Sequence, residues 1–144
     1  MIDTIPVPDT SSAVEAPFWE SLRQGHLLIQ HCRHCREWMF PTRIRCVQCG
    51  SAPEWKPVSG RGRIWSFTRV HPPVLPAFAA LTPYPVALVE LEEQRGIRLV
   101  GNLVERADGP INGVEPDKIA IGAPVEAVIR SVDGVPWPAW RIVG

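Results

Sequence analysis

Hydrophobic and polar positions alternate in short runs along the second half of the chain, and this pattern predicts β-strands. Five runs are rich in Val, Ile and aromatic residues and are bounded by turn-forming residues. They lie at 63–70, 86–92, 97–104, 125–130 and 137–143. A helical patch is expected only around 115–121, between the third and fourth runs. Five strands with one such insertion predict a small closed barrel of the OB type.

The first half of the chain has a different pattern. A short helix is predicted over 17–25, with a proline in its first turn, Phe18 and Leu22 on one face, and a glycine at its end. Two strand-like runs, 26–32 and 37–40, follow this helix. Each ends at turn-forming residues, so together they predict a hairpin.

All cysteines of the chain lie in two Cys-x-x-Cys pairs with ten residues between them, Cys32/Cys35 and Cys46/Cys49. Each pair presents two thiolates in one tight turn, and two turns supply the four ligands of a tetrahedral zinc site. Four cysteines leave no open coordination position, so zinc here would be structural. Iron in a rubredoxin-like arrangement is the competing metal. We interpret the neighbouring His31 and His34 as surface residues.

Composition limits the class of protein. The 144 residues are 45% hydrophobic with a formal net charge of +0, which is typical of a soluble globular protein. No stretch approaches the roughly 18 apolar residues of a membrane span. The N-terminus shows no basic start followed by an apolar run, so we expect no secretory signal and a cytoplasmic location. Disulfides are rare in the cytoplasm, which favours metal binding by the cysteines.

The neutral total charge conceals a basic segment. Residues 23–69 contain nine Lys or Arg residues against two Glu residues. The planar arginine side chain suits phosphate and carboxylate groups, which predicts an anionic ligand or an acidic partner surface. The best candidates are two arginines between the cysteine pairs and two beside glycines that allow close backbone approach: Arg43, Arg45, Arg61 and Arg63.

The longest loop runs from His71 to Pro85 and contains five prolines. Proline stiffens the loop, and its apolar side chains are expected to contact a ligand or another protein. The alternative, given equal weight, is a lid that folds over the core of its own barrel. Phe78 and Tyr84 are the candidate contact residues in this loop, with core packing as the alternative.

Several segments, taken in order, resemble a known family. They are "FWESLRQGHLLIQHCRHC", "FPTRIRCVQCGS", "EWKPVSGRGRIWSFTRV", "PYPVALVELEEQRGIRLVGNL", "IGAPVEAV" and "WPAWRI". From Phe18 to its end, the chain resembles small bacterial and archaeal proteins described as acyl-CoA-associated. These proteins have an N-terminal rubredoxin-like zinc ribbon and a C-terminal OB fold. The tryptophan-rich ending and the proline-dense first loop depart from the family pattern.

The resemblance implies a non-catalytic accessory subunit of a hetero-oligomer. Its partner would be a thiolase-like enzyme (a thiolase, retro-aldolase or acyltransferase) that acts on acyl-CoA esters and carries the catalytic residues. This chain would stabilise the partner and help to form the channel for the coenzyme A ester. The implied zinc ligands are Cys32, Cys35, Cys46 and Cys49, and the implied contacts to coenzyme A or the partner are Arg43, Arg45, Arg61, Arg63, Phe78 and Tyr84.

These observations together predict a mainly β protein in three parts. Residues 1–15, with two prolines and little periodicity, form an extended N-terminal arm. Residues 16–58 form the helix and the rubredoxin-like zinc ribbon. Prolines and glycines over 53–62 predict a linker with a boundary near residue 58. Residues 59–144 form a five-stranded OB-fold barrel.

Two other functions stay open. Trp65 and Phe67 lie among arginines on the first barrel strand, a mixture that single-stranded nucleic-acid binders use. The neutral total charge opposes this alternative, so nucleic acid is not the expected partner. An autonomous enzyme would need Ser66, His71 and Glu90 to converge, because the sequence has no Gly-x-Ser-x-Gly motif and no phosphate-binding loop.

Overall fold

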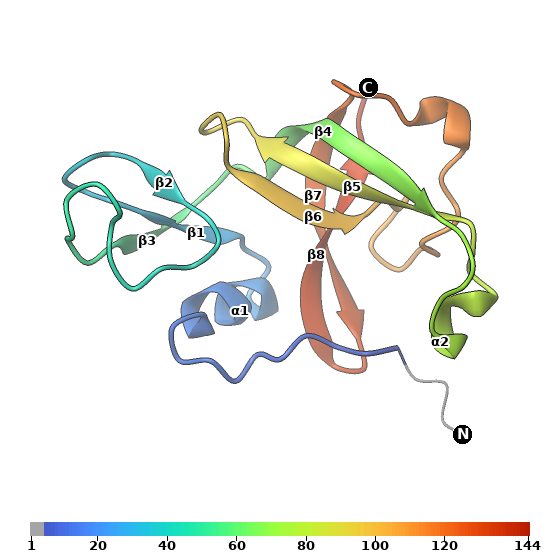
Figure 1. The fold of residues 1–144 in the computed structure, drawn as a ribbon, viewed down its shortest axis with the longest axis horizontal. Coiled ribbons are helices and arrows are strands. Elements are labelled where there is room, and N and C mark those ends of the chain that lie inside the picture. Colours follow the sequence, from blue (N-terminus) through green and yellow to red (C-terminus); the bar gives the residue numbers. More distant parts are fainter. Residues whose placement is uncertain (1–4) are drawn as a thin grey trace.

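The computed structural model describes residues 5–144 as a mainly β molecule with two antiparallel sheets (Figure 1). Residues 1–4 of the predicted arm lie outside the described residues. Residues 5–12 contain no helix or strand and lead to the first helix. No helix in the described part of the chain combines the length and hydrophobicity needed to cross a membrane.

Helix α1 (Ala16–Arg23) has a proline in its first turn and buries Phe18 and Leu22, as the four-residue spacing predicted. It precedes a small sheet with the strand order β2-β1-β3. The strands of this sheet are β1 (Leu28–His31), β2 (Trp38–Met39) and β3 (Glu54–Pro57).

The hairpin of β1 and β2 is confirmed, but the prediction of a linker over 53–62 is wrong for most of its length, because β3 covers Glu54–Pro57 and the first strand of the larger sheet begins at Arg61. β3 pairs with β1 through Leu28–Pro57 to His31–Glu54. Proline lacks a backbone donor and is tolerated at the ends of edge strands. Pro57 ends β3 at the sheet edge, so the prolines that suggested a linker are compatible with pairing.

The larger sheet contains the five predicted strands in the order β6-β5-β4-β7-β8. A 3-10 turn, η1 (Pro116–Lys118), lies in the predicted helical patch, whereas the short helix α2 (Pro76–Ala79) in the long loop was not predicted. The strands are β4 (Arg61–Val70), β5 (Tyr84–Leu91), β6 (Arg98–Asn102), β7 (Pro124–Val132) and β8 (Val135–Ile142).

The prediction of a closed barrel is wrong, because the sheet does not close. β6 and β8 are its edges, and an isolated bridge between Leu103 and Trp140 links the chain after β6 to β8. The N–H of Val104 donates to the Trp140 carbonyl at 2.9 Å. β6 is five residues long and is followed by a loop, so no continuous ladder forms along the eight residues of β8.

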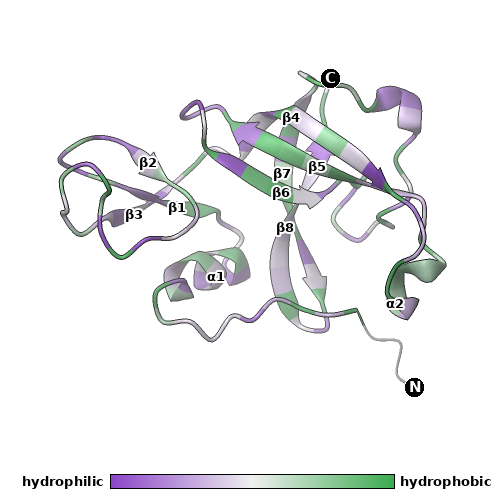
Figure 2. Cartoon of the chain, viewed as in Figure 1, coloured by the Kyte–Doolittle hydropathy of each residue, from purple (hydrophilic) through white to green (hydrophobic). Residues whose placement is uncertain are grey.

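One hydrophobic core connects both sheets with α1. Buried residues of β5 alternate with partly exposed ones, and Figure 2 shows hydrophobic and hydrophilic bands along this strand. Core residues come from the helix, the small sheet and the larger sheet, including Phe18, Leu22, Leu27, Ile29, Ile64, Val89, Leu99 and Trp140. Cys32, Met39 and Cys46 form a separate buried cluster. The small sheet therefore shares the main core, whereas its cysteine turns pack independently.

Candidate functional site

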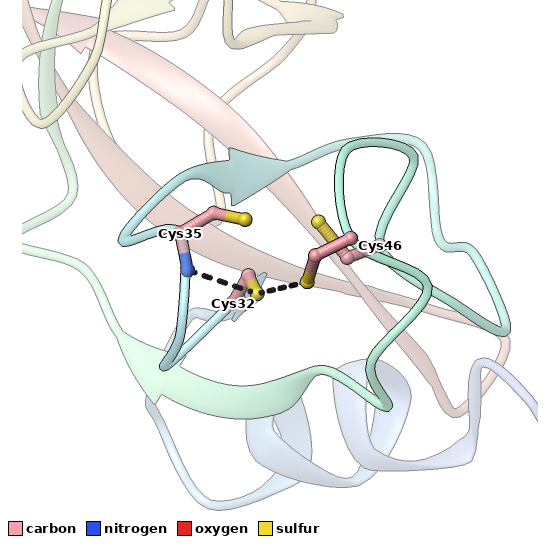
Figure 3. Close-up of side chains that lie close together, drawn as sticks. Cys32, Cys35 and Cys46 are labelled. Carbon is pink, nitrogen blue, oxygen red and sulfur yellow. Dashed lines mark hydrogen bonds between the residues drawn. The ribbon is translucent and has the colours of Figure 1, made fainter.

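The four cysteine sulfur atoms converge from two loops of the small sheet. Cys32 and Cys35 lie between β1 and β2, and Cys46 and Cys49 lie between β2 and β3. Figure 3 shows the three labelled side chains around a common centre. All four sulfur atoms lie within 4.8 Å of one another, and those of Cys32 and Cys49 are 3.6 Å apart. Tetrahedral zinc with Zn–S bonds of about 2.3 Å separates its sulfurs by about 3.8 Å, so this donor set fits zinc.

Backbone hydrogen bonds hold each cysteine turn in shape. The N–H of Cys32 donates to the Glu37 carbonyl, and the N–H of Cys46 donates to the Ser51 carbonyl, both at 2.8 Å. Within the first turn, the N–H of Cys35 points to the sulfur of Cys32 at 3.3 Å. Such N–H donors favour the thiolate form that binds metal.

The pKa values of two of the thiols, Cys35 and Cys49, are shifted in opposite directions. Hydrogen bonds from Ser51 lower the pKa of Cys49 to about 6, and the hydrogen bond with Cys49 raises the pKa of Cys35 to about 12. The lowered pKa favours the thiolate of Cys49, and the raised pKa favours the protonated thiol of Cys35. A metal that requires all four thiolates displaces such protons on binding.

His31 is buried, so the prediction that it is a surface residue is wrong. It lies on the central strand β1, between Trp38 of β2 and Glu54 of β3. Its Nδ1 atom is 3.3 Å from a Glu54 oxygen, and Arg33 contacts the other Glu54 oxygen at 2.8 Å. The hydrogen bond from Arg33 lowers the pKa of Glu54. His34 is exposed, as predicted.

The candidate arginines of the small sheet lie on its surface. The side chain of Gln30 bonds both the N–H and the carbonyl of Arg43 at 2.7 Å, which fixes the backbone while the side chain stays exposed. Arg45 donates to the Gly50 carbonyl at 3.1 Å. Two exposed apolar side chains lie in the same loop, Ile44 at 74% and Val47 at 65% exposure.

Arg61 and Arg63 lie on β4, a different element from the other two candidates. Arg61 pairs with Glu92 at 2.9 Å, and Arg63 donates to the Gly122 carbonyl at 2.9 Å. The four candidate arginines therefore lie on two different elements, Arg43 and Arg45 in the loop between β2 and β3 and Arg61 and Arg63 on β4. Contact with coenzyme A or a partner remains a prediction for each of them.

The long loop after β4 folds onto the molecule itself. The rings of Phe78 and Tyr84 lie 5.8 Å apart, and Tyr84 is buried with Val104, Ile111 and Ala139. In this chain by itself, Tyr84 is therefore a core residue, as the alternative to a contact role predicted. Leu75, immediately before α2, is 57% exposed. A ligand or interface role for Phe78 and Tyr84 remains a prediction.

Trp38 and Phe40 are half-buried, and both pack against the main core. A contact that the sequence did not indicate supports this arrangement. The side chain of Gln94, in the turn between β5 and β6, accepts from the Trp38 N–H at 2.9 Å. Only the fold reveals this link, because 56 residues separate the two positions.

Trp65 is exposed on β4, and the guanidinium of Arg98 lies 3.7 Å from its ring centroid. Glu90 pairs with Arg98 at 3.1 Å. Glu90 is thus engaged in an ion pair, and no hydrogen bond joins it to Ser66 or His71 among the described residues. Glu90 pairs in register with Arg63 near the start of β4, whereas His71 follows the far end of that strand, so Ser66, His71 and Glu90 do not converge.

The chain is similar to several known proteins over most of its length. It is 36% identical to a chain of the solved structure "Ltp2-ChsH2(DUF35) aldolase", with a TM-score of 0.78 over 94% of this chain and 98% of that one. A DUF35 domain-containing scaffold protein of Methanothermobacter thermautotrophicus is 37% identical over 79% of this chain and 80% of its own length.

A probable enoyl-CoA hydratase alpha subunit of Thermomonospora curvata is 44% identical over 75% of this chain. The aligned region spans only 31% of that relative's length. Two domain families match in succession, the ChsH2 rubredoxin-like zinc ribbon domain at residues 19–54 and the ChsH2 C-terminal OB-fold domain at residues 55–130. The chain therefore belongs to the DUF35 family of ChsH2-type proteins, in which a zinc ribbon precedes an OB-fold domain.

Proposed function

We propose that this chain is a non-catalytic, zinc-binding accessory subunit that assembles with a thiolase-like enzyme acting on acyl-CoA esters. The observation that carries the proposal is the match to a chain of an Ltp2-ChsH2(DUF35) aldolase over 94% of this chain. Other relatives are named as DUF35 scaffold proteins and as a hydratase alpha subunit. The proposed role is to stabilise the partner and to help form the channel for the coenzyme A ester.

The cysteine site supports a structural role. Four thiolates complete the coordination of zinc and leave no position for a substrate. Zinc held by Cys32, Cys35, Cys46 and Cys49 would fix the loops of the small sheet. Because the described residues contain no convergent set around Ser66, His71 and Glu90, the partner supplies the catalytic residues in this proposal.

The loop between β2 and β3, which carries the second cysteine pair, is the proposed docking surface. It exposes Ile44 and Val47 with Arg43 and Arg45 beside them. An apolar centre with polar residues around it is typical of protein interfaces, and arginine is enriched there. The partner surface is therefore expected to be apolar with acidic residues at its rim.

Co-expression with thiolase-like proteins encoded beside this chain tests the proposal. We expect a stable complex in size-exclusion chromatography, and we expect acyl-CoA turnover by the complex but not by this chain alone. Ile44→Asp should weaken the complex at least tenfold. Ile121→Asp, at a 72% exposed position on the larger domain, serves as the matched control. If the chain stays alone beside every such neighbour, or turns over acyl-CoA esters alone, the proposal is wrong.

The nucleic-acid alternative is favoured by one observation, the exposed Trp65 with Arg98 against its ring. Ion pairs oppose it, because Glu90 neutralises Arg98 and Glu92 neutralises Arg61 on the same sheet. Binding of a single-stranded oligonucleotide that weakens steeply with salt would support this alternative. We expect no such binding.

A further inference from the structure

A pocket of about 370 Å³ lies where α1, the turn after β2, and strands β6 and β8 meet. Phe18 and Trp19 of α1, Phe40 after β2, and Trp137 of β8 line it, and Pro8 of the extended N-terminal segment contributes to one wall. This volume lies within the range of small-molecule sites, which are mostly apolar with a few polar groups. The metal ligands and the exposed apolar residues of the proposed docking surface lie outside it.

The aromatic walls are held in place by packing. Phe18 is buried in the main core, with its ring 5.0 Å from Trp19 and 6.3 Å from Phe40. The indole N–H of Trp19 donates to the carboxylate of Glu15 at 3.3 Å. Glu15 is the only charged residue in the described lining. The pocket therefore presents ring faces and hydrocarbon, and its one carboxylate already has a donor.

Two polar residues complete the lining, Thr42 and Asn102. Neither side chain forms a hydrogen bond with another residue in the described part of the chain. A ligand oxygen can accept from the Asn102 carboxamide or the Thr42 hydroxyl. A few polar groups of this kind orient a ligand in an otherwise apolar site.

We propose that this pocket binds the apolar ring system of a small molecule that carries a carbonyl or hydroxyl oxygen. Aromatic walls pack favourably against rings, and a rigid ring system loses less conformational freedom on binding than a flexible chain does. The proposal goes beyond the proposed function and concerns this chain alone.

Binding of 2-acetylnaphthalene, a two-ring ketone, to the full chain tests the proposal. Val100 lines the pocket and is 64% exposed, so Val100→Trp fills the pocket from its open side without disturbing the core. Ile121→Trp, at a 72% exposed position outside the pocket, is the matched control. We expect equal Kd values for the native chain and the control in calorimetry, and at least tenfold weaker binding by Val100→Trp. Absence of binding by the native chain, or equal binding by both variants, overturns the proposal.

A second comparison tests the polar groups. The double variant Thr42→Val with Asn102→Ala should bind 2-acetylnaphthalene at least threefold more weakly and bind 2-ethylnaphthalene unchanged, because only the ketone offers an acceptor. Decanoate that binds as tightly as the ketone would contradict the preference for rings. A homodimer that Val100→Trp dissociates would show that a second copy occupies the pocket, and would also overturn the proposal. Failure of the co-expression experiment leaves these binding results unaffected.

Discussion

Arg36 and Gly50 occupy equivalent positions in the two cysteine turns. The N–H of Arg36 donates to the Cys32 carbonyl at 2.7 Å, and the N–H of Gly50 donates to the Cys46 carbonyl at 2.9 Å. Both residues have positive φ angles, 61° for Arg36 and 73° for Gly50. Glycine adopts this conformation freely, whereas a residue with a Cβ atom pays about 1–2 kcal/mol. The two turns share one backbone shape, and only the first carries this cost.

Arg36→Gly is expected to stabilise the small sheet by about 0.5–1 kcal/mol. The substitution removes the strain of the left-handed conformation in the folded state. Part of this gain is offset, because glycine has the larger conformational entropy in the unfolded state. Guanidinium unfolding with saturating zinc measures the change. Gly50→Ala, the reciprocal variant, should destabilise the protein by about 1 kcal/mol. If Arg36→Gly destabilises the protein, the Arg36 side chain stabilises the fold by more than its left-handed backbone conformation destabilises it.

Cys46→Ser is expected to abolish stoichiometric zinc binding and to unfold the cysteine turns, because metal-binding energy is local folding energy. The main core should persist, since Ile29 of β1 belongs to the main core and not to the cluster of cysteines. Metal analysis and hydrogen exchange of β1 check both parts. His34→Ala, at an exposed position beside the ligands, should retain one zinc per chain. Iron in the native protein, or equal zinc in Cys46→Ser, would contradict the assignment.

The lowered pKa of Glu90 makes the free energy of unfolding depend on pH in the acidic range. The hydrogen bond from the Gly96 N–H at 3.0 Å is the main cause that lowers the pKa of Glu90, followed by desolvation in the opposite direction and by the hydrogen bond from Arg98. A lowered carboxyl pKa contributes stability above its ordinary value of 4.5, and this stability is lost as pH falls through the lowered pKa. Glu90→Gln should therefore flatten the loss of stability between about pH 5 and 3. Urea unfolding at a series of pH values measures this slope, and a slope that Glu90→Gln leaves unchanged would contradict the assignment.

At Gly62, β4 approaches β5 too closely for a residue with a Cβ atom. A Cβ atom there would strike the Glu90 carbonyl oxygen and lie 2.7 Å from a methyl carbon of Val89. Because backbone cannot move aside as a side chain can, Gly62→Ala should cost about 3 kcal/mol in the free energy of unfolding. Ser66→Ala, on the same strand, should change it by less than about 0.5 kcal/mol. Equal stability of the two variants would show that β4 and β5 separate without cost.

The strands of the larger sheet and α1 could be predicted because their patterns are local. β5 alternates buried and partly exposed residues, and α1 buries two residues four positions apart. β3 was missed because the prolines around it suggest a loop, and its pairing with β1 depends on residues more than twenty positions away. The open sheet was missed because closure depends on the length of β6 relative to β8.

By itself, the sequence determined the grouping of the four cysteines, since two Cys-x-x-Cys turns bring their thiols together over short distances. It also determined the order of the zinc ribbon and the OB-fold domain. Only the tertiary structure decided that His31 is buried and that Gln94 links the larger sheet to Trp38. The pocket lined by α1 and β6 likewise depends on the tertiary structure. These features arise where residues distant in sequence pack together, and packing of distant residues leaves no periodic signal in the chain.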